Sequence, residues 1–260
     1  MDIINKFNKG IDLLKTKYLM KFKQKIFVGN KYKINYLLEK NSKSNDLLIV
    51  FSACTNIGQK ARYNYIRTLD EFKCNKLFIL DDFGFDGRGA YYLGKDKDFK
   101  IEEDVRTLIK KIGEEVNPKN EIYIGSSKGG YSALYFGVER KNSHIIIGAP
   151  QYNLGDYLNL PNHQNIMEYI MGDCSDEAIN KLNNLMKDKL ILNKDNSNSI
   201  YIHYSTEEET YDSDIKPLLD QMKNINLKVN HDKREYSSHA ELTLFFPDYI
   251  KSMVNKIIEE

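Results

Sequence analysis

The residues best suited to chemistry surround one serine. Gly125, Ser127 and Gly129 form a Gly-x-Ser-x-Gly run between an apolar stretch at 122–124 and a helix-compatible run at 131–136. In a strand–turn–helix of this kind, called a nucleophile elbow, the serine is strained and only very small side chains fit two residues to either side. Its hydroxyl then projects at the positive N-terminus of the helix, where negative charge is stabilised. The pattern predicts Ser127 as a nucleophile.

Two alternatives compete with Ser127 as a nucleophile: the neighbouring serine, and a glycine-rich turn without catalytic function. Ser126 is adjacent, but only Ser127 is centred between the two glycines. A plain glycine-rich turn would show the same residues, so the partners of the serine have to decide.

A serine alcohol needs a base, and the base needs an acid that fixes its tautomer. In hydrolases with an elbow the chain order is serine, acid, histidine. His239 follows the last predicted strand, at the entrance to the final helix, and is the expected base. Of the other histidines, we expect His203 and His231 to be structural, and His163 either to touch substrate or to lie in a solvated loop.

The acid is expected just after the strand at 200–205. Glu207 is the first choice, and Glu208, Glu209 and Asp212 remain open because the whole stretch is acidic. A merely charged surface loop is the alternative.

An oxyanion hole requires two aimed N–H donors. The backbone of Lys128, directly after the nucleophile, should supply one. The turn after the strand at 47–52 should supply the other, from Ala53 or Cys54.

Strands and helices alternate along most of the chain. A β-hairpin is expected at 26–38, and apolar runs that read as buried strands follow at 47–52, 77–80, 122–124, 144–148, 200–205 and 228–236. Helices are expected at 63–72, 101–116, 131–136, 215–222 and 240–258. This alternation predicts an α/β fold with a mostly parallel sheet covered by helices on both faces.

Three segments stand apart from this alternation. Residues 150–199, with a helical patch near 176–192, interrupt it and read as a cap or lid insertion. The glycine-rich loop at 81–93 lies where open α/β folds bind ligands, so Arg88, Tyr91 and Tyr92 could hold a sugar or an anion, or could simply pack. Residues 1–25 have apolar groups at helical spacing and a basic opposite face, which predicts an amphipathic helix. We expect residues 26–260 to form a single domain. The helix would pack on this domain or contact a membrane surface or a protein partner.

Length, composition and net charge limit the classes of protein to which the chain can belong. The chain has 260 residues, 41% hydrophobic and 29% charged, with a net charge of +1. These values fit a globular protein of one domain and give no electrostatic case for nucleic acid. Three cysteines without metal spacing indicate a reducing compartment, so we expect a cytoplasmic protein without metal or cofactor.

The core, about residues 47–255, resembles the α/β-hydrolase superfamily through its elbow and triad order. Gly-Ser-Ser-Lys-Gly-Gly at 125–130, Asp-Asp-Phe-Gly at 81–84, Arg-Gly-Ala-Tyr-Tyr-Leu-Gly at 88–94 and Tyr-Asn-Tyr-Ile-Arg at 63–67 are similar to a bacterial group that includes XcbB/CpsF-type capsule-biosynthesis proteins and hydrolase-like accessory Sec proteins. The resemblance implies acyl-ester chemistry on glycans, with O-acetyl transfer or its reversal.

We therefore expect a serine esterase or acyltransferase that works through an acyl-Ser127 intermediate. A small-molecule or glycan acyl ester would be its substrate. The alternative is a catalytically silent hydrolase-fold subunit of a polysaccharide or secretion assembly.

Overall fold

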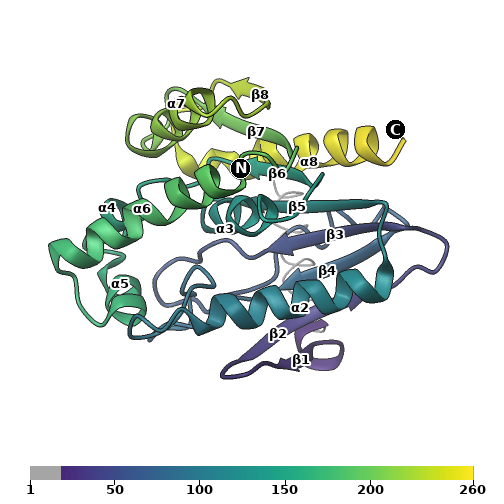
Figure 1. Ribbon diagram of the computed structural model, residues 1–260, viewed down its shortest axis with the longest axis horizontal. Helices are drawn as coiled ribbons and strands as arrows, with labels where there is room; N and C mark the ends of the chain where they lie inside the picture. Colours follow the sequence, from purple (N-terminus) through teal and green to yellow (C-terminus); the bar gives the residue numbers. More distant parts are fainter. Residues whose placement is uncertain (1–18, 260) are drawn as a thin grey trace, which may run out of the picture.

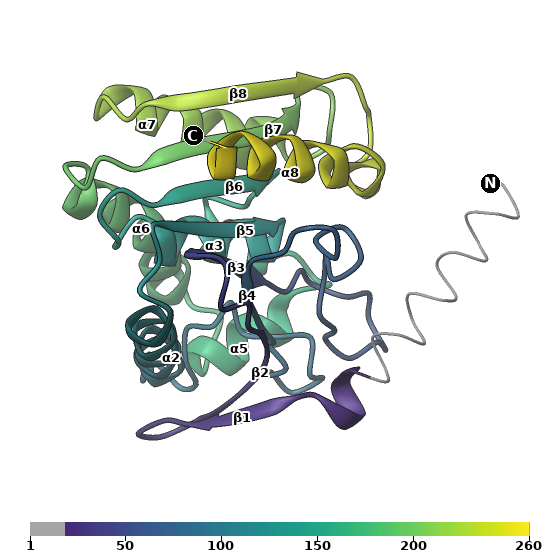
Figure 2. The ribbon, with the colours of Figure 1, turned by 90° about the vertical axis from the view of Figure 1, so that its right-hand side faces the viewer.

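The predicted strands assemble into one eight-stranded sheet. The computed structural model describes residues 19–259, and Figure 2 shows the strands stacked from β8 at the top to β1 at the bottom. Their order is β1-β2-β4-β3-β5-β6-β7-β8. The β1–β2 and β2–β4 pairs are antiparallel, and the remaining pairs are parallel. The strands are β1 (Lys25–Val28), β2 (Lys33–Glu39), β3 (Asp46–Phe51), β4 (Asn75–Ile79), β5 (Asn120–Ser126), β6 (His144–Gly148), β7 (Ser199–Ser205) and β8 (Val229–Arg234).

The central strands are apolar along their whole length because both faces of the sheet are covered. All residues of β4 are buried, and so are residues 47–51 of β3. Continuous rather than alternating apolar runs are typical of parallel strands packed between two helical layers. The predicted α/β class and the mostly parallel sheet are confirmed.

The helices described in residues 19–259 include most of those expected. Their bounds are α2 (Lys100–Val116), α3 (Lys128–Gly137), α4 (Leu154–Leu158), α5 (Gln164–Met171), α6 (Asp176–Asn193), α7 (Lys216–Asn224) and α8 (Leu242–Glu259), with a one-turn π-helix at Tyr211–Ile215 and a 3₁₀ turn at His239–Glu241.

Helices α3 and α8 cover opposite faces of the sheet. A Cβ atom on Gly137 of α3 would lie 2.9 Å from the side chain of Ile145, and a Cβ atom on Gly148 would lie 2.8 Å from the ring of Phe246 in α8. Ile145 and Gly148 are three residues apart on β6, so their side chains point to opposite faces. The sheet therefore lies between two helical layers.

One predicted helix is wrong. Residues 63–72 form turns instead, although their apolar side chains are buried at a spacing that resembles a helix. Two tertiary contacts hold this segment: Asn64 accepts a hydrogen bond from the Ala53 N–H, and the Tyr65 hydroxyl pairs with Ser126. Tyr65 itself has φ 60°, which a helix does not allow.

The segment at 150–199 forms α4, α5 and α6 between β6 and β7, and the helix expected near 176–192 is confirmed by α6. Figure 1 shows these three helices on the left, on the side where β3 and β4 end. Lys189 on α6 forms ion pairs with Glu139 and with Glu102 of α2. These contacts tie α6 to α2 and to the turn after α3.

The helix expected over residues 1–25 lies largely outside the described residues. Residues 19–22 are helical, and β1 begins at Lys25. No helix among residues 19–259 has the length and apolar character needed to cross a bilayer.

Candidate active site

Ser127 sits on a strained turn between β5 and α3. Its backbone has φ 51° and ψ −123°, a region that costs a non-glycine residue of the order of 1–3 kcal/mol. A Cβ atom on Gly125 would lie 2.0 Å from the carbonyl oxygen of Gly129, and one on Gly129 would lie 2.7 Å from that of Phe51. The two glycines are therefore required by close backbone approach, as the sequence pattern predicts.

The two adjacent serines have different surroundings. Ser126 is buried, and its hydroxyl pairs with that of Tyr65. Ser127 is half-buried, and its Oγ accepts a hydrogen bond of 3.1 Å from Nε2 of Gln151. Only Ser127 thus combines the elbow conformation with a partly exposed hydroxyl.

The structure pairs His239 with Glu208. The Nδ1 atom of His239 lies 3.2 Å from Oε2 of Glu208, whose side chain is fully buried, and Oε1 of Glu208 accepts a hydrogen bond from the Thr210 hydroxyl. A buried carboxylate on Nδ1 fixes the tautomer that presents Nε2 as the proton acceptor. Nε2 of His239 is itself buried and has no partner among residues 19–259.

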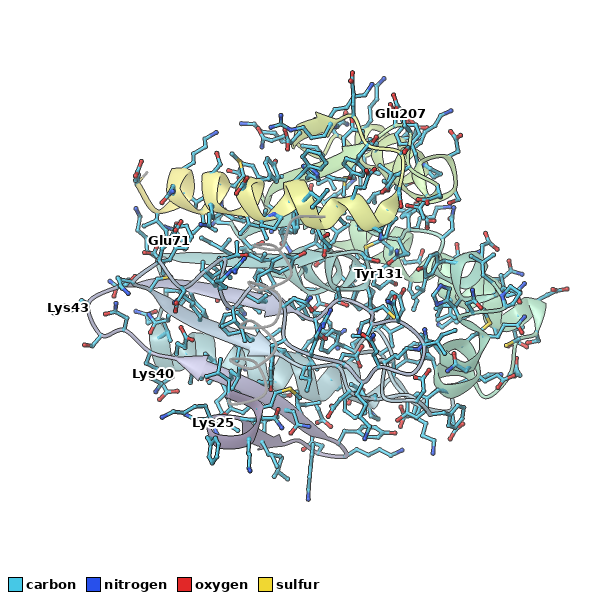
Figure 3. All side chains as sticks on the ribbon, turned by 180° about the vertical axis from the view of Figure 1, so that it is seen from behind. Lys25, Lys40, Lys43, Glu71, Tyr131 and Glu207 are labelled. Atoms are coloured by element: carbon cyan, nitrogen blue, oxygen red, sulfur yellow. The ribbon has the colours of Figure 1, made fainter. Side chains whose placement is uncertain are left out.

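The other candidate acids have different positions. Glu207, the first choice from the sequence, is exposed, and Figure 3 places it at the outer surface. Glu209 accepts a hydrogen bond of 2.7 Å from the backbone N–H of His239, which holds the pKa of its carboxyl below the usual range. Asp212 is almost fully exposed. The choice of Glu207 over Glu208 therefore does not agree with the geometry: adjacent residues in this loop point to opposite sides, and only Glu208 faces inward.

Two contacts bring the loops of the site together. The Ser205 hydroxyl at the end of β7 accepts hydrogen bonds from the N–H groups of Glu207 and Tyr236, which joins the acidic loop to the loop before His239. The ring of Tyr65, bonded to Ser126, packs edge-on against Phe246 of α8 with centroids 5.6 Å apart. Among the described residues, no hydrogen bond joins Ser127 directly to His239. Such bonds often tighten only when substrate is bound.

His203 is fully buried in β7, as expected of a structural residue. Its Nδ1 lies 2.7 Å from Oδ2 of Asp232 on β8, and its ring stacks on Tyr236. Burial lowers the pKa of His203, although Asp232 acts in the opposite direction. His231 on the edge strand β8 is exposed.

The three backbone N–H groups expected to form the oxyanion hole differ in their hydrogen bonds. The N–H of Ala53 is used by the side chain of Asn64, at 2.9 Å. We find no acceptor among residues 19–259 for the backbone N–H of Cys54 or of Lys128, the first residue of α3. Their expected role in an oxyanion hole stays a prediction.

A buried ion pair lies directly behind the elbow. Nζ of Lys128 is 2.7 Å from Oδ2 of Asp81, and neither side chain is exposed to solvent. Asp81 also accepts hydrogen bonds from the backbone N–H groups of Ala90 and Tyr92. One carboxylate therefore anchors both the residue after the nucleophile and the glycine-rich loop.

The four side chains expected to bind substrate lie mainly inside the fold. Arg88 is buried, bonds to Asp86 and donates to the α4–α5 segment. Tyr92 is fully buried, and its hydroxyl bonds to Ser52 and to the carbonyl of Ile79. These contacts give Arg88 and Tyr92 structural tasks, because both side chains are buried and bonded to other parts of the fold.

Tyr91 contacts Gln151, the residue bonded to Ser127, and His163 directly precedes α5. The Tyr91 hydroxyl donates to Oε1 of Gln151 at 3.4 Å, behind Ser127. His163 is half-buried, stacks on Tyr157 with ring centroids 4.6 Å apart, and has an unpartnered Nδ1. Burial and nearby Arg88 lower its pKa, so the ring is neutral near pH 7.

Sequence reasoning missed Gln151, the residue in contact with Ser127. It follows Pro150 after β6 and is fully buried. The available signal was its position: it is the first polar side chain beyond the carboxyl end of a strand that neighbours the elbow strand.

Cysteine and metal chemistry have less support in this region. Burial raises the pKa of the Cys54 thiol, so it is protonated near neutral pH and is a poor nucleophile. Within residues 19–259, His, Cys, Asp and Glu side chains form no group of three or more that could hold a metal ion.

The arrangement of sheet, elbow and histidine loop is that of the α/β-hydrolase fold, and comparison with solved structures supports this. The capsule O-acetyltransferase of Neisseria meningitidis serogroup A superposes with a TM-score of 0.74 at 23% identity, covering 88% of this chain and 93% of that one. A structure of the same enzyme with CoA gives a TM-score of 0.71 at 21% identity, with 92% and 99% covered.

Two further matches extend this result. The Glycosylation Associate Protein (Gap123) complex from Streptococcus agalactiae gives a TM-score of 0.71 at 20% identity, with 89% of this chain and 46% of that chain covered. Fluorophosphonate-binding serine hydrolase F of Staphylococcus aureus gives 0.62 at 10% identity, with 92% and 100% covered. No protein-family model matches the sequence, and no curated protein matches it significantly. At these identities the structural matches establish the α/β-hydrolase fold.

Proposed function

We propose that this chain is a serine-dependent O-acyltransferase or esterase that acts on acyl esters of glycans in surface-polysaccharide or glycoprotein biosynthesis. One observation carries the proposal: a serine in a strained elbow conformation lies in the same fold as a histidine whose Nδ1 contacts a buried glutamate. Ser127, His239 and Glu208 would form the triad. The glycan substrate is suggested by the capsule O-acetyltransferase and glycosylation-associated neighbours.

The mechanism follows from the polarity of these groups. His239 Nε2 takes the Oγ proton as Ser127 attacks the acyl carbon, and Glu208 stabilises the resulting imidazolium. The tetrahedral oxyanion binds the N–H groups of Lys128 and Cys54. His239 then gives its proton to the leaving oxygen or sulfur, the bond from the acyl carbon to that atom breaks, and acyl-Ser127 remains.

The second half of the reaction decides between hydrolysis and transfer. An acceptor hydroxyl gives its proton to His239 and attacks the acyl carbon, and Ser127 Oγ leaves and regains the proton. Water as acceptor makes an esterase, and a sugar hydroxyl makes an acyltransferase. The neighbour solved with CoA supports a CoA thioester as the donor to test first.

Labelling of the serine tests the chemistry directly. A fluorophosphonate probe should label the wild-type protein and spare Ser127→Ala, with Ser126→Ala as the matched control that still labels. Product analysis with acetyl-CoA and unmodified glycan, beside acetylated glycan and water, then separates transfer from hydrolysis. Equal labelling of wild type and Ser127→Ala would refute the proposal.

The acid is tested by two adjacent substitutions. Glu208→Gln leaves the shape of the loop intact but removes the charge beside His239, so turnover of p-nitrophenyl acetate should fall about 10³- to 10⁴-fold. Glu207→Gln changes an exposed side chain and should leave turnover within about twofold of wild type. The reverse ranking would move the acid back to Glu207.

A second candidate function is a catalytically silent subunit, favoured by the match to a multi-protein glycosylation complex. Phe22, Ile26 and Val28 are exposed and lie within or directly after the lysine-rich stretch 1–25, so they could contact a protein partner or an anionic membrane. A silent subunit would hydrolyse p-nitrophenyl acetate no faster than His239→Ala does. Salt-dependent liposome binding lost on deletion of residues 1–25 is required for the membrane alternative.

Location in the cytoplasm is part of the same proposal. It is supported by Cys54, Cys74 and Cys174, which are all free thiols, because free cysteines are typical of reducing compartments. Fractionation of producing cells beside a known cytoplasmic enzyme is the direct measurement.

A further inference from the structure

Gln151 contacts the atom on which the proposed chemistry depends. Its Nε2 lies 3.1 Å from Oγ of Ser127, and the whole residue is buried. A buried amide beside a nucleophile is positioned by its surroundings rather than by solvent, so the contacts of Gln151 indicate what it does.

The amide of Gln151 also contacts Tyr91. The hydroxyl of Tyr91 donates to Oε1 of Gln151 at 3.4 Å, which leaves the Nε2 end of the amide facing Ser127. Burial raises the pKa of Tyr91 well above its ordinary value, so this hydroxyl stays protonated and remains a donor. In this arrangement the oxygen of the amide faces Tyr91 and its N–H donor faces the serine.

The backbone around Gln151 is fixed from both sides. Before it, Ala149 has φ 38° and donates its N–H to the carbonyl of His203. After it, the N–H groups of Tyr152 and Asn153 both donate to Oδ1 of Asp214, at 2.7 and 3.0 Å. Asp214 is itself buried. The side chain of Gln151 is therefore held by a turn anchored on both flanks.

The hydrogen bond from Gln151 constrains the serine proton. A hydroxyl oxygen that accepts an N–H bond still carries its own proton and can donate it to another group. Nε2 of His239, which is buried and has no partner among residues 19–259, is the base proposed to receive it. An amide donor on Oγ also stabilises negative charge that develops there as the proton leaves.

We propose that Gln151 is a further catalytic residue, which donates a hydrogen bond to Oγ of Ser127 and thereby stabilises that oxygen whenever it carries negative charge. The inference rests on the proposed function. In the first half-reaction, charge develops on Oγ as its proton moves to His239 and the bond to the acyl carbon forms. In the second, the same bond breaks, Oγ leaves with the electron pair and His239 returns the proton. Gln151 acts in both steps, whereas Tyr91 and Asp214 are positioning residues.

Replacing Gln151 by the isosteric glutamate tests whether the residue acts as a hydrogen-bond donor or only as part of the structure. Gln151→Glu keeps the shape of the side chain, but its carboxylate form can only accept hydrogen bonds, while its protonated form can still donate one to Oγ. The rate of fluorophosphonate labelling is measured for this variant and for wild type between pH 5 and pH 8, with melting temperatures at each pH. Gln221→Glu on α7 is the matched control for adding a carboxylate.

The expected readout is the ratio of variant to wild-type labelling rates. This ratio should be lowered about 10- to 100-fold at pH 8, the range for a lost hydrogen bond to a charged group. It should recover as the pH falls and the introduced carboxyl becomes protonated. A purely structural role predicts a ratio that does not change with pH. Gln151→Met, which cannot donate at all, should be slow at every pH.

The outcomes distinguish the two levels of the proposal. If wild type labels, Ser127→Ala does not, and the Gln151→Glu ratio is flat, the role of Gln151 is refuted while the proposed function stands. If Ser127→Ala is labelled as strongly as the wild-type protein, both the role of Gln151 and the proposed function are refuted. If Gln151→Glu does not fold, the comparison rests on Gln151→Met, and labelling of this variant at the wild-type rate at pH 8 overturns the inference.

Discussion

The buried pair of Lys128 and Asp81 gives the sharpest stability prediction. Replacing Lys128 by Met keeps most of the side-chain volume and the backbone N–H proposed for the oxyanion hole, but leaves the Asp81 carboxylate without its cation. Replacing Asp81 by Asn leaves the ammonium group of Lys128 unpaired in the core instead.

The magnitude follows from distance and burial. Two unit charges 2.7 Å apart attract by about 6 kcal/mol at an effective dielectric constant of 20. The cost of desolvating both ions offsets most of this attraction, so the pair adds little net stability. Removing one partner leaves a buried, unpaired charge, and each single substitution should therefore lower the free energy of unfolding by about 3–5 kcal/mol. For a chain of this size that corresponds to a fall in melting temperature of roughly 6–20 °C.

The double variant is the discriminating measurement. With both charges gone, Lys128→Met/Asp81→Asn should lose less stability than the sum of the single losses, by about 2 kcal/mol or more, as expected for coupled residues. Urea unfolding of the four proteins gives these values. Lys100→Met breaks the half-exposed Lys100–Glu103 pair as a control, and should cost no more than about 1 kcal/mol.

Additivity of the two single losses, within about 0.5 kcal/mol, would refute the reasoning. A second readout separates stability from chemistry. Folded Lys128→Met should still react with a fluorophosphonate, because the oxyanion N–H belongs to the backbone.

Three further predictions concern other parts of the structure. Gly125→Ala should prevent labelling or folding, because its Cβ would lie 2.0 Å from the carbonyl oxygen of Gly129; a labelled, folded variant would contradict the elbow geometry. Ser126→Ala should remain labelled and lose only modest stability, about 1 kcal/mol for one hydrogen bond, by thermal unfolding. Because burial lowers the pKa of His203 below its unfolded value of about 6.5, the unfolded chain binds that proton first and stability should decrease as pH falls below about 6.5. His203→Gln, still facing Asp232, should show a smaller decrease between pH 7.5 and pH 5.5, and an unchanged decrease would exclude His203 as the cause.

The tie between α6 and the main domain also bears on the expected lid. Lys189 on α6 contacts Glu139 and Glu102 and lies over the ring of Tyr135, 4.2 Å from its centroid. A helix held by several partly buried charges does not move freely as a rigid body. Helix α5 is held as well, because the N–H groups of Asp96 and Lys97 donate to the carbonyls of Tyr169 and Ile170.

The sequence by itself determined the features that depend on local geometry. Gly125, Ser127 and Gly129 predicted an elbow, because the need for very small side chains two residues to either side of the serine is visible in the local sequence, although Gly129 clears the carbonyl oxygen of Phe51 on β3. Continuous apolar runs such as 47–51 determined buried parallel strands. The position of His239 after the last strand followed from chain order, without any knowledge of contacts.

Only the tertiary structure decided which neighbour faces inward. Glu207 and Glu208 are chemically alike, and the contact of Glu208 with His239 depends on how two loops from β7 and β8 meet. The same holds for Gln151, whose contact with Ser127 joins residues 24 positions apart. Such choices are made by packing between distant segments, so composition and spacing do not decide them, although the position of Gln151 just after β6 marks it as a candidate.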